Sequence, residues 1–223
     1  MLFDIDGTVM RGAGSHHKDA LVEGIRQVTG LSTTLDGVAT SGMLDRDLIA
    51  GMLRRSGVSE SRIRSLMRRV MAECQMAYLA NCAADLRDRI CQGIVELLAT
   101  LRERGAVLGV VTGNLTEIGW KKLHLAGIRE HFSVGAFAED GATRARLACL
   151  AARRARKAGL IAEHARISLI GDHGNDVEAA KTNGFQAVAV ATGLTSYEEL
   201  ALSCPDILVR DVTELNVEQL LWL

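Results

Sequence analysis

The 223-residue chain contains one proline, Pro205, and five scattered cysteines that lack any Cys-x-x-Cys spacing. This odd, unclustered set argues against a disulfide framework or a structural zinc site and is typical of reduced thiols in a cytoplasmic protein. No apolar run approaches the roughly 20 residues that span a bilayer. The N-terminus, MLFDIDGT, lacks the basic start and apolar stretch of a signal peptide.

The chain also has little excess charge, since 26 Lys and Arg residues face 27 Asp and Glu residues and give a formal net charge of -1. This balance provides no global field that would attract nucleic acid or an anionic membrane, so we expect neither as a partner. The composition, 48% hydrophobic and 24% charged, is typical of a globular protein. The length supports one large domain, or one domain that carries a smaller insert.

Helical and strand-like patterns alternate from about residue 94 onward. Short apolar runs predict buried strands at 107–111, 133–137, 167–170, 187–191 and 207–209. Helical periodicity predicts helices at 94–104, 117–125, 144–158 and 177–182. Alternation of this kind is typical of an α/β protein with a Rossmann-like, doubly wound parallel sheet.

The segment before this alternation is different. Residues 14–93 contain amphipathic helical stretches, such as 46–55 and 61–78, without a convincing buried strand. We therefore predict an all-helical cap at 14–93, inserted into a core formed by 1–13 and 94–223. Only three residues precede Asp4, so either the first strand is very short or the start is truncated.

Three apolar strands end in polar side chains. The first is followed by Asp4 and Asp6, the second by Thr112, Gly113 and Asn114, and the third by Asp172, with Asp176 four residues further on. Each motif alone is also a common turn. Because the carboxyl ends of parallel strands meet at one edge of a sheet, the three together predict a ligand site.

Carboxylates that converge in this way need a cation. Two of them about 4 Å apart repel by roughly 4 kcal/mol at an effective dielectric constant near 20. Either some of them are protonated at neutral pH, or a metal ion neutralises them. An all-oxygen set of ligands favours Mg²⁺.

These motifs, in this order, resemble the haloacid dehalogenase superfamily, in particular its phosphoglycolate phosphatase-like members with a helical cap. The resemblance implies that Asp4 is the nucleophile that forms an aspartyl-phosphate. It implies that Asp6 protonates the leaving group and then activates water. An acid at this position favours phosphate esters over haloacids.

The same resemblance implies the remaining roles. Thr112, with the amides of Gly113 and Asn114, would bind the phosphoryl group. Asp4, Asp172 and the backbone carbonyl of Asp6 would bind Mg²⁺, with Asp176 at or just behind the metal.

The sequence departs from the family pattern at the third motif, where a lysine is usual. No lysine lies between Lys122 and Lys157, and we predict that Arg144 takes this role, with Arg146 as the second candidate. A guanidinium can bridge a carboxylate and a phosphate. Both arginines could instead be solvated. His173, in the predicted metal loop, is expected to be a loop residue rather than a ligand.

The expected function is hydrolysis of a small-molecule phosphomonoester, with a phosphomutase or a catalytically idle phosphate-binding module as alternatives. Candidate substrate-selecting residues are Arg11, His16, His17, Lys18 and the turn 40–46. The paired histidines are more often part of a solvated flap. The sequence identifies neither the substrate nor the oligomeric state.

Overall fold

A six-stranded parallel sheet forms the centre of the protein in a computed structural model that describes residues 1–12, 14–38 and 40–222. The strand order is β3-β2-β1-β4-β5-β6, so β1 lies between β2 and β4. The strands are β1 (Leu2–Phe3), β2 (Gly109–Val111), β3 (Val134–Ala136), β4 (Ser168–Gly171), β5 (Gln186–Val190) and β6 (Ile207–Val209). The predicted α/β class with a parallel sheet is confirmed.

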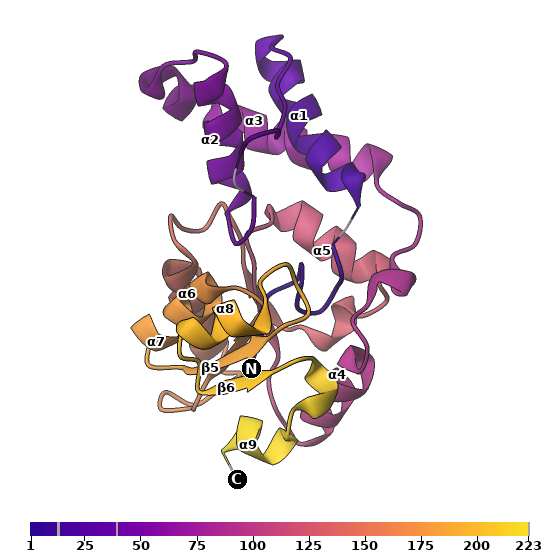
Figure 1. Cartoon of the computed structure of the whole chain (residues 1–223), viewed down its shortest axis with the longest axis vertical. Helices are drawn as coiled ribbons and strands as arrows, with labels where there is room; N and C mark the ends of the chain where they lie inside the picture. Colours follow the sequence, from indigo (N-terminus) through magenta and orange to yellow (C-terminus); the bar gives the residue numbers. More distant parts are fainter. Residues whose placement is uncertain (13, 39, 223) are drawn as a thin grey trace.

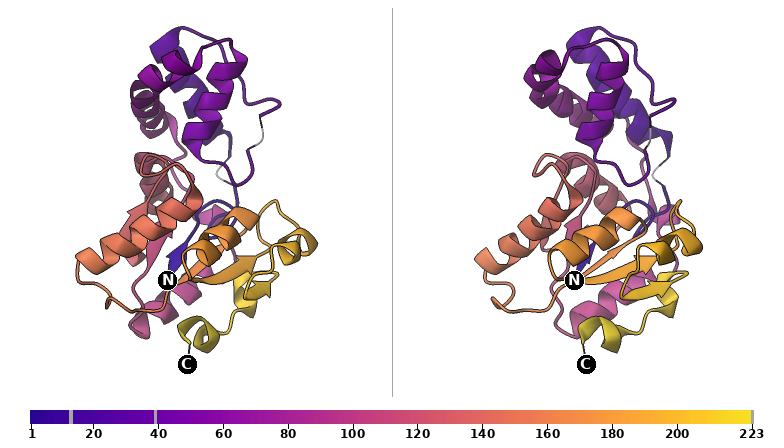
Figure 2. Two further views of the ribbon diagram at one scale, coloured as in Figure 1. Left: turned by 90° about the vertical axis from the view of Figure 1, so that its left-hand side faces the viewer. Right: turned by 60° about the vertical axis from the view of Figure 1, so that its left-hand side comes forward.

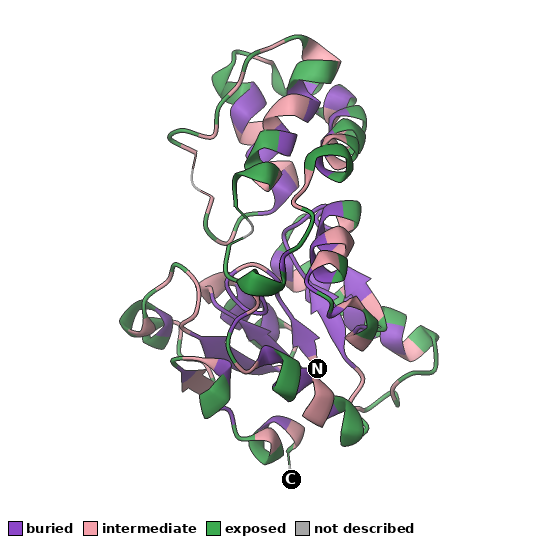
Figure 3. Cartoon of the chain, turned by 90° about the vertical axis from the view of Figure 1, so that its right-hand side faces the viewer, coloured by how far each residue is buried: buried purple, intermediate pink, exposed green. Residues whose placement is uncertain are grey.

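Helices cover both faces of this sheet (Figure 1). They are α4 (Ile94–Glu103), α5 (Thr116–Leu125), α6 (Arg144–Lys157), α7 (Gly174–Thr182), α8 (Tyr197–Leu202) and α9 (Val217–Leu221). Successive strand residues point to opposite faces, so Leu2 packs in the cluster that contains α6 and α7, and Phe3 in the cluster that contains α4 and α9. The strands are therefore buried on both sides (Figure 3).

Most predicted elements begin and end within two residues of the observed ones. Two predicted limits are wrong by three residues. The helix predicted at 61–78 ends at Asn81. Helix α7 begins at Gly174 rather than 177, because the His173 side chain accepts a hydrogen bond from the Asn175 backbone N–H and caps the helix. The short helices α8 and α9 were not predicted. Of the described helices, none combines the length and the hydrophobicity needed to cross a bilayer.

The helices α1 (Ser15–Thr29), α2 (Asp45–Arg55) and α3 (Glu60–Asn81) form a separate bundle beyond one edge of the sheet (Figures 1 and 2). Gly24 allows α1 to cross α3 closely, since a Cβ there would lie 2.5 Å from the backbone nitrogen of Cys74. We call these three helices the cap.

The two connections between cap and core run side by side. The Arg11 N–H donates to the Arg89 carbonyl at 2.7 Å, and the Cys91 N–H donates to the Val9 carbonyl at 3.1 Å. Residue 13, at the predicted boundary, lies outside the described residues. The limits 14 and 93 therefore stay a prediction.

Candidate active site

The polar residues that follow β1, β2 and β4 meet at one edge of the sheet. Phe3 pairs with Val110 on one side and Ile170 on the other, so Asp4, Thr112 and Asp172 end neighbouring strands at similar height. This edge faces the cap. The strand order brings Asp4 next to Thr112 and Asp172, which both follow it by more than 100 residues in the sequence.

Three buried carboxylates form a cluster at this edge. Asp4, Asp172 and Asp176 each offer an oxygen atom, and these atoms lie within 4.8 Å of one another. Within the described part of the chain, Asp176 Oδ1 is buried and accepts no hydrogen bond, although the Arg144 Nε atom lies 3.3 Å from it. One guanidinium does not offset three buried carboxylates, so the cluster keeps an excess of negative charge. This all-oxygen donor set fits a divalent metal ion.

Arg144 supplies the protein's own positive charge to this cluster. Its Nη1 atom lies 2.9 Å from Asp4 Oδ1, and its Nε atom lies 3.3 Å from Asp176 Oδ1. Arg144 is the first residue of α6, which Thr143 caps, and its side chain is buried, whereas Arg146 is exposed. The structure thus brings Arg144, and not Arg146, to Asp4.

The cluster shifts the pKa values of its members. Burial, then the charges of Asp4 and Asp176, raises the pKa of Asp172 to about 8. Burial and Asp4 raise the pKa of Asp176 to about 7, although Arg144 opposes the shift. Burial disfavours the charge of Arg144, but Asp176 and Asp4 outweigh it and raise the pKa of Arg144. All three carboxylates are therefore not ionised together at neutral pH without a further cation.

Small residues and hydroxyls surround Asp172. Thr8 is fully buried, and its hydroxyl donates to Asp172 Oδ1 at 3.0 Å. Gly7 has φ of 87°, and a Cβ there would lie 2.2 Å from Asp172 Oδ2. A Cβ at Gly193 would also overlap this carboxylate. Two glycines therefore make the space in which Asp172 lies.

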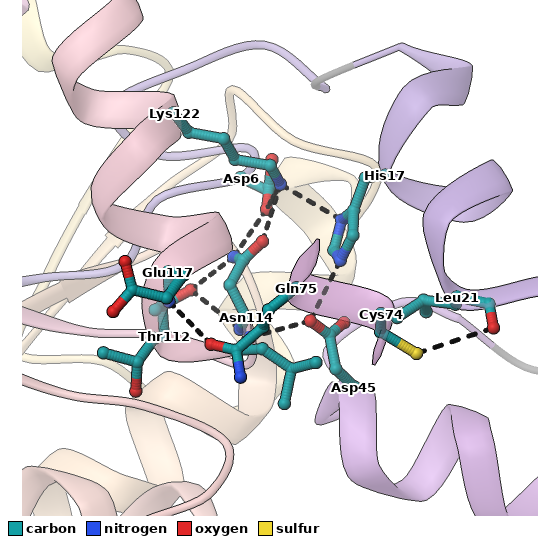
Figure 4. Close-up of polar contacts among 12 residues, drawn as sticks. Asp6, His17, Leu21, Asp45, Cys74, Gln75, Thr112, Asn114, Glu117 and Lys122 are labelled. Atoms are coloured by element: carbon teal, nitrogen blue, oxygen red, sulfur yellow. Dashed lines mark hydrogen bonds and ion pairs between the residues drawn. The ribbon is translucent and has the colours of Figure 1, made fainter. Parts of the chain in front are cut away.

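The side chain of Asp6 turns away from the acidic cluster. Its two oxygens lie 2.9 and 2.7 Å from the Lys122 ammonium, and Asn114 Nδ2 donates to Asp6 Oδ2 at 2.8 Å (Figure 4). Burial would raise the pKa of Asp6, but the charge of Lys122, together with hydrogen bonds from Lys122 and Asn114, acts against burial, and the pKa of Asp6 is lowered. Only the backbone of Asp6 is thus left for the predicted metal site.

The loop after β2 is in contact with the cap. The Gly113 carbonyl accepts a hydrogen bond from the Asp45 N–H at 2.8 Å, and a Cβ at Gly113 would lie 2.4 Å from the Met43 carbonyl oxygen. Thr112 Oγ1 accepts from Asn114 Nδ2 at 2.7 Å. The expected phosphate-binding roles of Thr112, Gly113 and Asn114 stay predictions.

A cavity of about 620 Å³ lies between this edge and the cap. Its lining includes Asp4, Asp6, Thr112, Arg144 and Asp172 from the core, and Arg11, His17, Lys18, Leu21, Leu35 and Leu48 from the cap and its connection. Of the paired histidines, His16 is exposed and His17 faces the cavity. His173 also lines it, next to Gly42 of the predicted cap turn.

Sequence reasoning missed Lys122 and Thr8. Lys122 occupies the buried stripe of α5, four residues after Ile118 and next to Leu123, where an apolar residue is usual. A lysine at such a position is a detectable signal, because a buried ammonium needs partners. Thr8 gives no comparable signal, since a threonine after Asp-Gly is common in turns.

Comparison with known proteins gives the following similarities. The family model for haloacid dehalogenase-like hydrolases matches residues 1–181. A phosphoglycolate phosphatase of Synechococcus elongatus is 31% identical over 167 residues, which cover 74% of this chain and 72% of that protein. The tyrosine-protein kinase PtkA of Mycobacterium tuberculosis is 28% identical over 203 residues, 86% of this chain and 62% of that protein.

Solved structures show the same fold. The β-phosphoglucomutase of Clostridium difficile has a TM-score of 0.68 at 16% identity, with 98% of this chain and 93% of that chain covered. A haloacid dehalogenase-like family protein of Streptococcus pneumoniae has a TM-score of 0.60 at 18% identity, with 96% and 94% covered.

The raised pKa of Asp172 predicts how the stability of the metal-free protein depends on pH. An aspartate titrates at about 3.9 when unfolded and here at about 8, so between these values the folded state binds more protons. The free energy of unfolding should therefore fall as the pH rises from about 5 to about 8. Urea unfolding in a chelator measures this slope. Asp172→Asn should flatten it, and Asp19→Asn, at an exposed site, should not; a slope unchanged by Asp172→Asn would contradict the assignment.

Proposed function

Because the chain belongs to the haloacid dehalogenase-like hydrolases, we propose that it is a Mg²⁺-dependent phosphatase that hydrolyses a small-molecule phosphomonoester through an aspartyl-phosphate. The observation that carries this proposal is the buried contact of 2.9 Å between Arg144 and Asp4. The contact orients a carboxylate at the floor of a cavity large enough for a small metabolite. A fixed cation beside it would also attract phosphoryl oxygens.

In the first half of the reaction, an oxygen of Asp4 attacks phosphorus and the bond between phosphorus and the ester oxygen breaks. The departing oxygen takes a proton from Asp6, and the alcohol leaves. Arg144 offsets the charge on the transferring phosphoryl group. Thr112, at the end of β2, and the amide of Gly113 lie in the cavity lining beside Asp4 and would hold the other phosphoryl oxygens.

In the second half, water attacks the phosphorus of the aspartyl-phosphate. Asp6, now a carboxylate, takes the proton of that water, and the bond between phosphorus and the Asp4 oxygen breaks. Inorganic phosphate forms, and Asp4 is restored as a carboxylate. The lowered pKa of Asp6 favours this second step, since a general base must be unprotonated when water attacks, and it opposes the first step, in which Asp6 must carry a proton.

Asp4, Asp172 and the Asp6 backbone carbonyl would hold Mg²⁺, with Asp176 at or behind it. The ion would neutralise charge on the phosphoryl oxygens and bring them to Asp4. Among the described residues, Arg144 is the one cation that contacts this cluster, through Asp4 and Asp176. Full ionisation of the three carboxylates therefore leaves a formal charge of -2, which matches a divalent ion.

A phosphomutase is the second candidate. Leu21, Leu35 and Leu48 of the cap line the cavity, and an apolar roof restricts water while the phosphoryl group passes to another hydroxyl. Product analysis after incubation with a sugar monophosphate and the matching bisphosphate separates the two. Release of inorganic phosphate supports the phosphatase, and an isomeric sugar phosphate supports the mutase.

Asp4→Asn should abolish the covalent intermediate with little change in shape, because an amide oxygen is a poor nucleophile. Acid quenching of the enzyme with radiolabelled acetyl phosphate should trap label on the wild type and on Asp19→Asn, and none on Asp4→Asn. Label retained on Asp4→Asn would move the nucleophile elsewhere. Absence of label and turnover in all three proteins would favour the idle phosphate-binding module.

Removal of metal should abolish turnover, because the carboxylate cluster then repels the phosphate. Exhaustive treatment with a chelator, followed by addition of Mg²⁺, should eliminate and then restore phosphate release. Mg²⁺ should also raise the melting temperature of the wild type and not that of Asp172→Asn. Full activity in metal-free protein would refute this part of the mechanism.

Arg144→Ala should reduce the rate by about 10²-fold or more, as expected for loss of one preorganised electrostatic group. Arg144→Lys should recover part of this loss, since a point charge remains but the fork of the guanidinium does not. The matched control is Arg146→Ala, two residues away on the exposed face of α6. If steady-state kinetics give a lower kcat for Arg146→Ala than for Arg144→Ala, the third-motif role belongs to Arg146.

A further inference from the structure

Lys122 is a fully buried lysine whose ammonium lies behind the active-site cavity. Its Nζ atom lies 2.9 and 2.7 Å from the two oxygens of Asp6, 2.6 Å from Asn114 Oδ1 and 3.1 Å from His17 Nδ1 (Figure 4). An ammonium has three N–H donors, and these contacts involve three groups. One N–H of Lys122 therefore points to each of Asp6, Asn114 and His17, and the two oxygens of Asp6 share the same N–H.

These contacts fix the Asp6 carboxylate from behind. Lys122 holds both oxygens, and Asn114 Nδ2 donates to Oδ2 at 2.8 Å. The side chain of Asp6 is 32% exposed, and that of Lys122 is not exposed. Among the described residues that line the cavity, Asp6, Asn114 and His17 are present and Lys122 is not. Lys122 therefore has no surface to offer a substrate and acts through its partners.

We infer that Lys122 is a positioning residue for Asp6, which it holds where the carboxylate exchanges protons with the departing oxygen and with water. The inference rests on the proposed function. It separates the roles of the two buried cations, since Arg144 contacts Asp4 and Asp176, while Lys122 contacts Asp6. Arg144, which takes the role of the third-motif lysine, therefore does not need to contact Asp6.

The cap completes this arrangement. Because Lys122 can only donate, Nδ1 of His17 is the acceptor, and Nε2 carries the hydrogen that goes to Asp45 Oδ2 at 2.9 Å. Asp45, at the start of α2, also accepts from the Leu115 N–H of the core at 2.8 Å. All three donors of Lys122 are thus satisfied when α1 and α2 lie against the core.

The test compares Lys122→Met with Lys121→Met, the same substitution one residue earlier, where the side chain is only partly buried. Cleavage of an alkyl phosphate needs a proton from Asp6, whereas nitrophenolate leaves without one. Lys122→Met should lower kcat for an alkyl phosphate by about 10²-fold, as misplacement by about 1 Å does, with little change in KM. The pre-steady-state burst of nitrophenol from nitrophenyl phosphate should stay close to wild type.

A double-mutant cycle tests whether Lys122 acts through Asp6. In an Asp6→Asn background, Lys122→Met should lower kcat almost no further, because the carboxylate that Lys122 positions is already absent. An undiminished effect in that background, or a nitrophenol burst slowed as much as alkyl phosphate cleavage, would overturn the inference. Lys122→Gln, which keeps the two N–H donors of an amide but not the charge, replaces Lys122→Met in the cycle if the latter does not fold, with the same pattern expected.

An inactive wild type would refute the proposed function and leave Lys122 to be judged by structure. Crystal structures of Lys122→Met (or Lys122→Gln) and of Lys121→Met provide that readout. The Asp6 carboxylate should leave its wild-type position in the Lys122 variant and keep it in the Lys121 variant. An Asp6 side chain that stays in place without Lys122 would show that Asn114 alone suffices, and the inference would be wrong.

Discussion

The active site depends on the balance between three buried carboxylates and one buried guanidinium. Asp4, Asp172 and Asp176 offer oxygens within 4.8 Å of one another, and Arg144 contacts two of the three residues. Each carboxylate pair at about 4 Å costs roughly 4 kcal/mol at an effective dielectric near 20, which is a large part of the net stability of a domain. The raised pKa values of Asp172 and Asp176 result from the same excess of negative charge. A divalent cation would neutralise this excess.

The parallel sheet explains why these charges are found together at all. β1 is only two residues long, yet it pairs with β2 and β4 on either side, so its end is fixed by its neighbours rather than by its own length. Phe3 is fully buried and anchors the residue before Asp4. The fold thus compensates for the electrostatic cost through apolar burial directly beneath the site.

The sequence allowed prediction of the elements and of the residues at the strand ends, because apolar runs and the polar residues after them are local signals. It also favoured Arg144 over Arg146, since the start of α6 lies at the same edge as the ends of the strands. It did not reveal Lys122, whose partners Asp6 and His17 lie 116 and 105 residues away. Nor did it reveal that His173 would cap α7, because that depends on a ring orientation fixed next to Gly42 of the cap.

The two buried cations differ in what holds them in place. Every acidic partner of Arg144 belongs to the core, among the described residues, so the geometry around Asp4 does not require the cap. Lys122 shares its donors between the core residues Asp6 and Asn114 and the cap residue His17. If α1 moves away, one donor loses its partner, and the position of Asp6 becomes less constrained, while Asp4 keeps its contact with Arg144. In the proposed mechanism, attack on phosphorus and proton exchange with the leaving group would therefore differ in their dependence on the cap, since only proton exchange would rely on a side chain whose position the cap helps to fix.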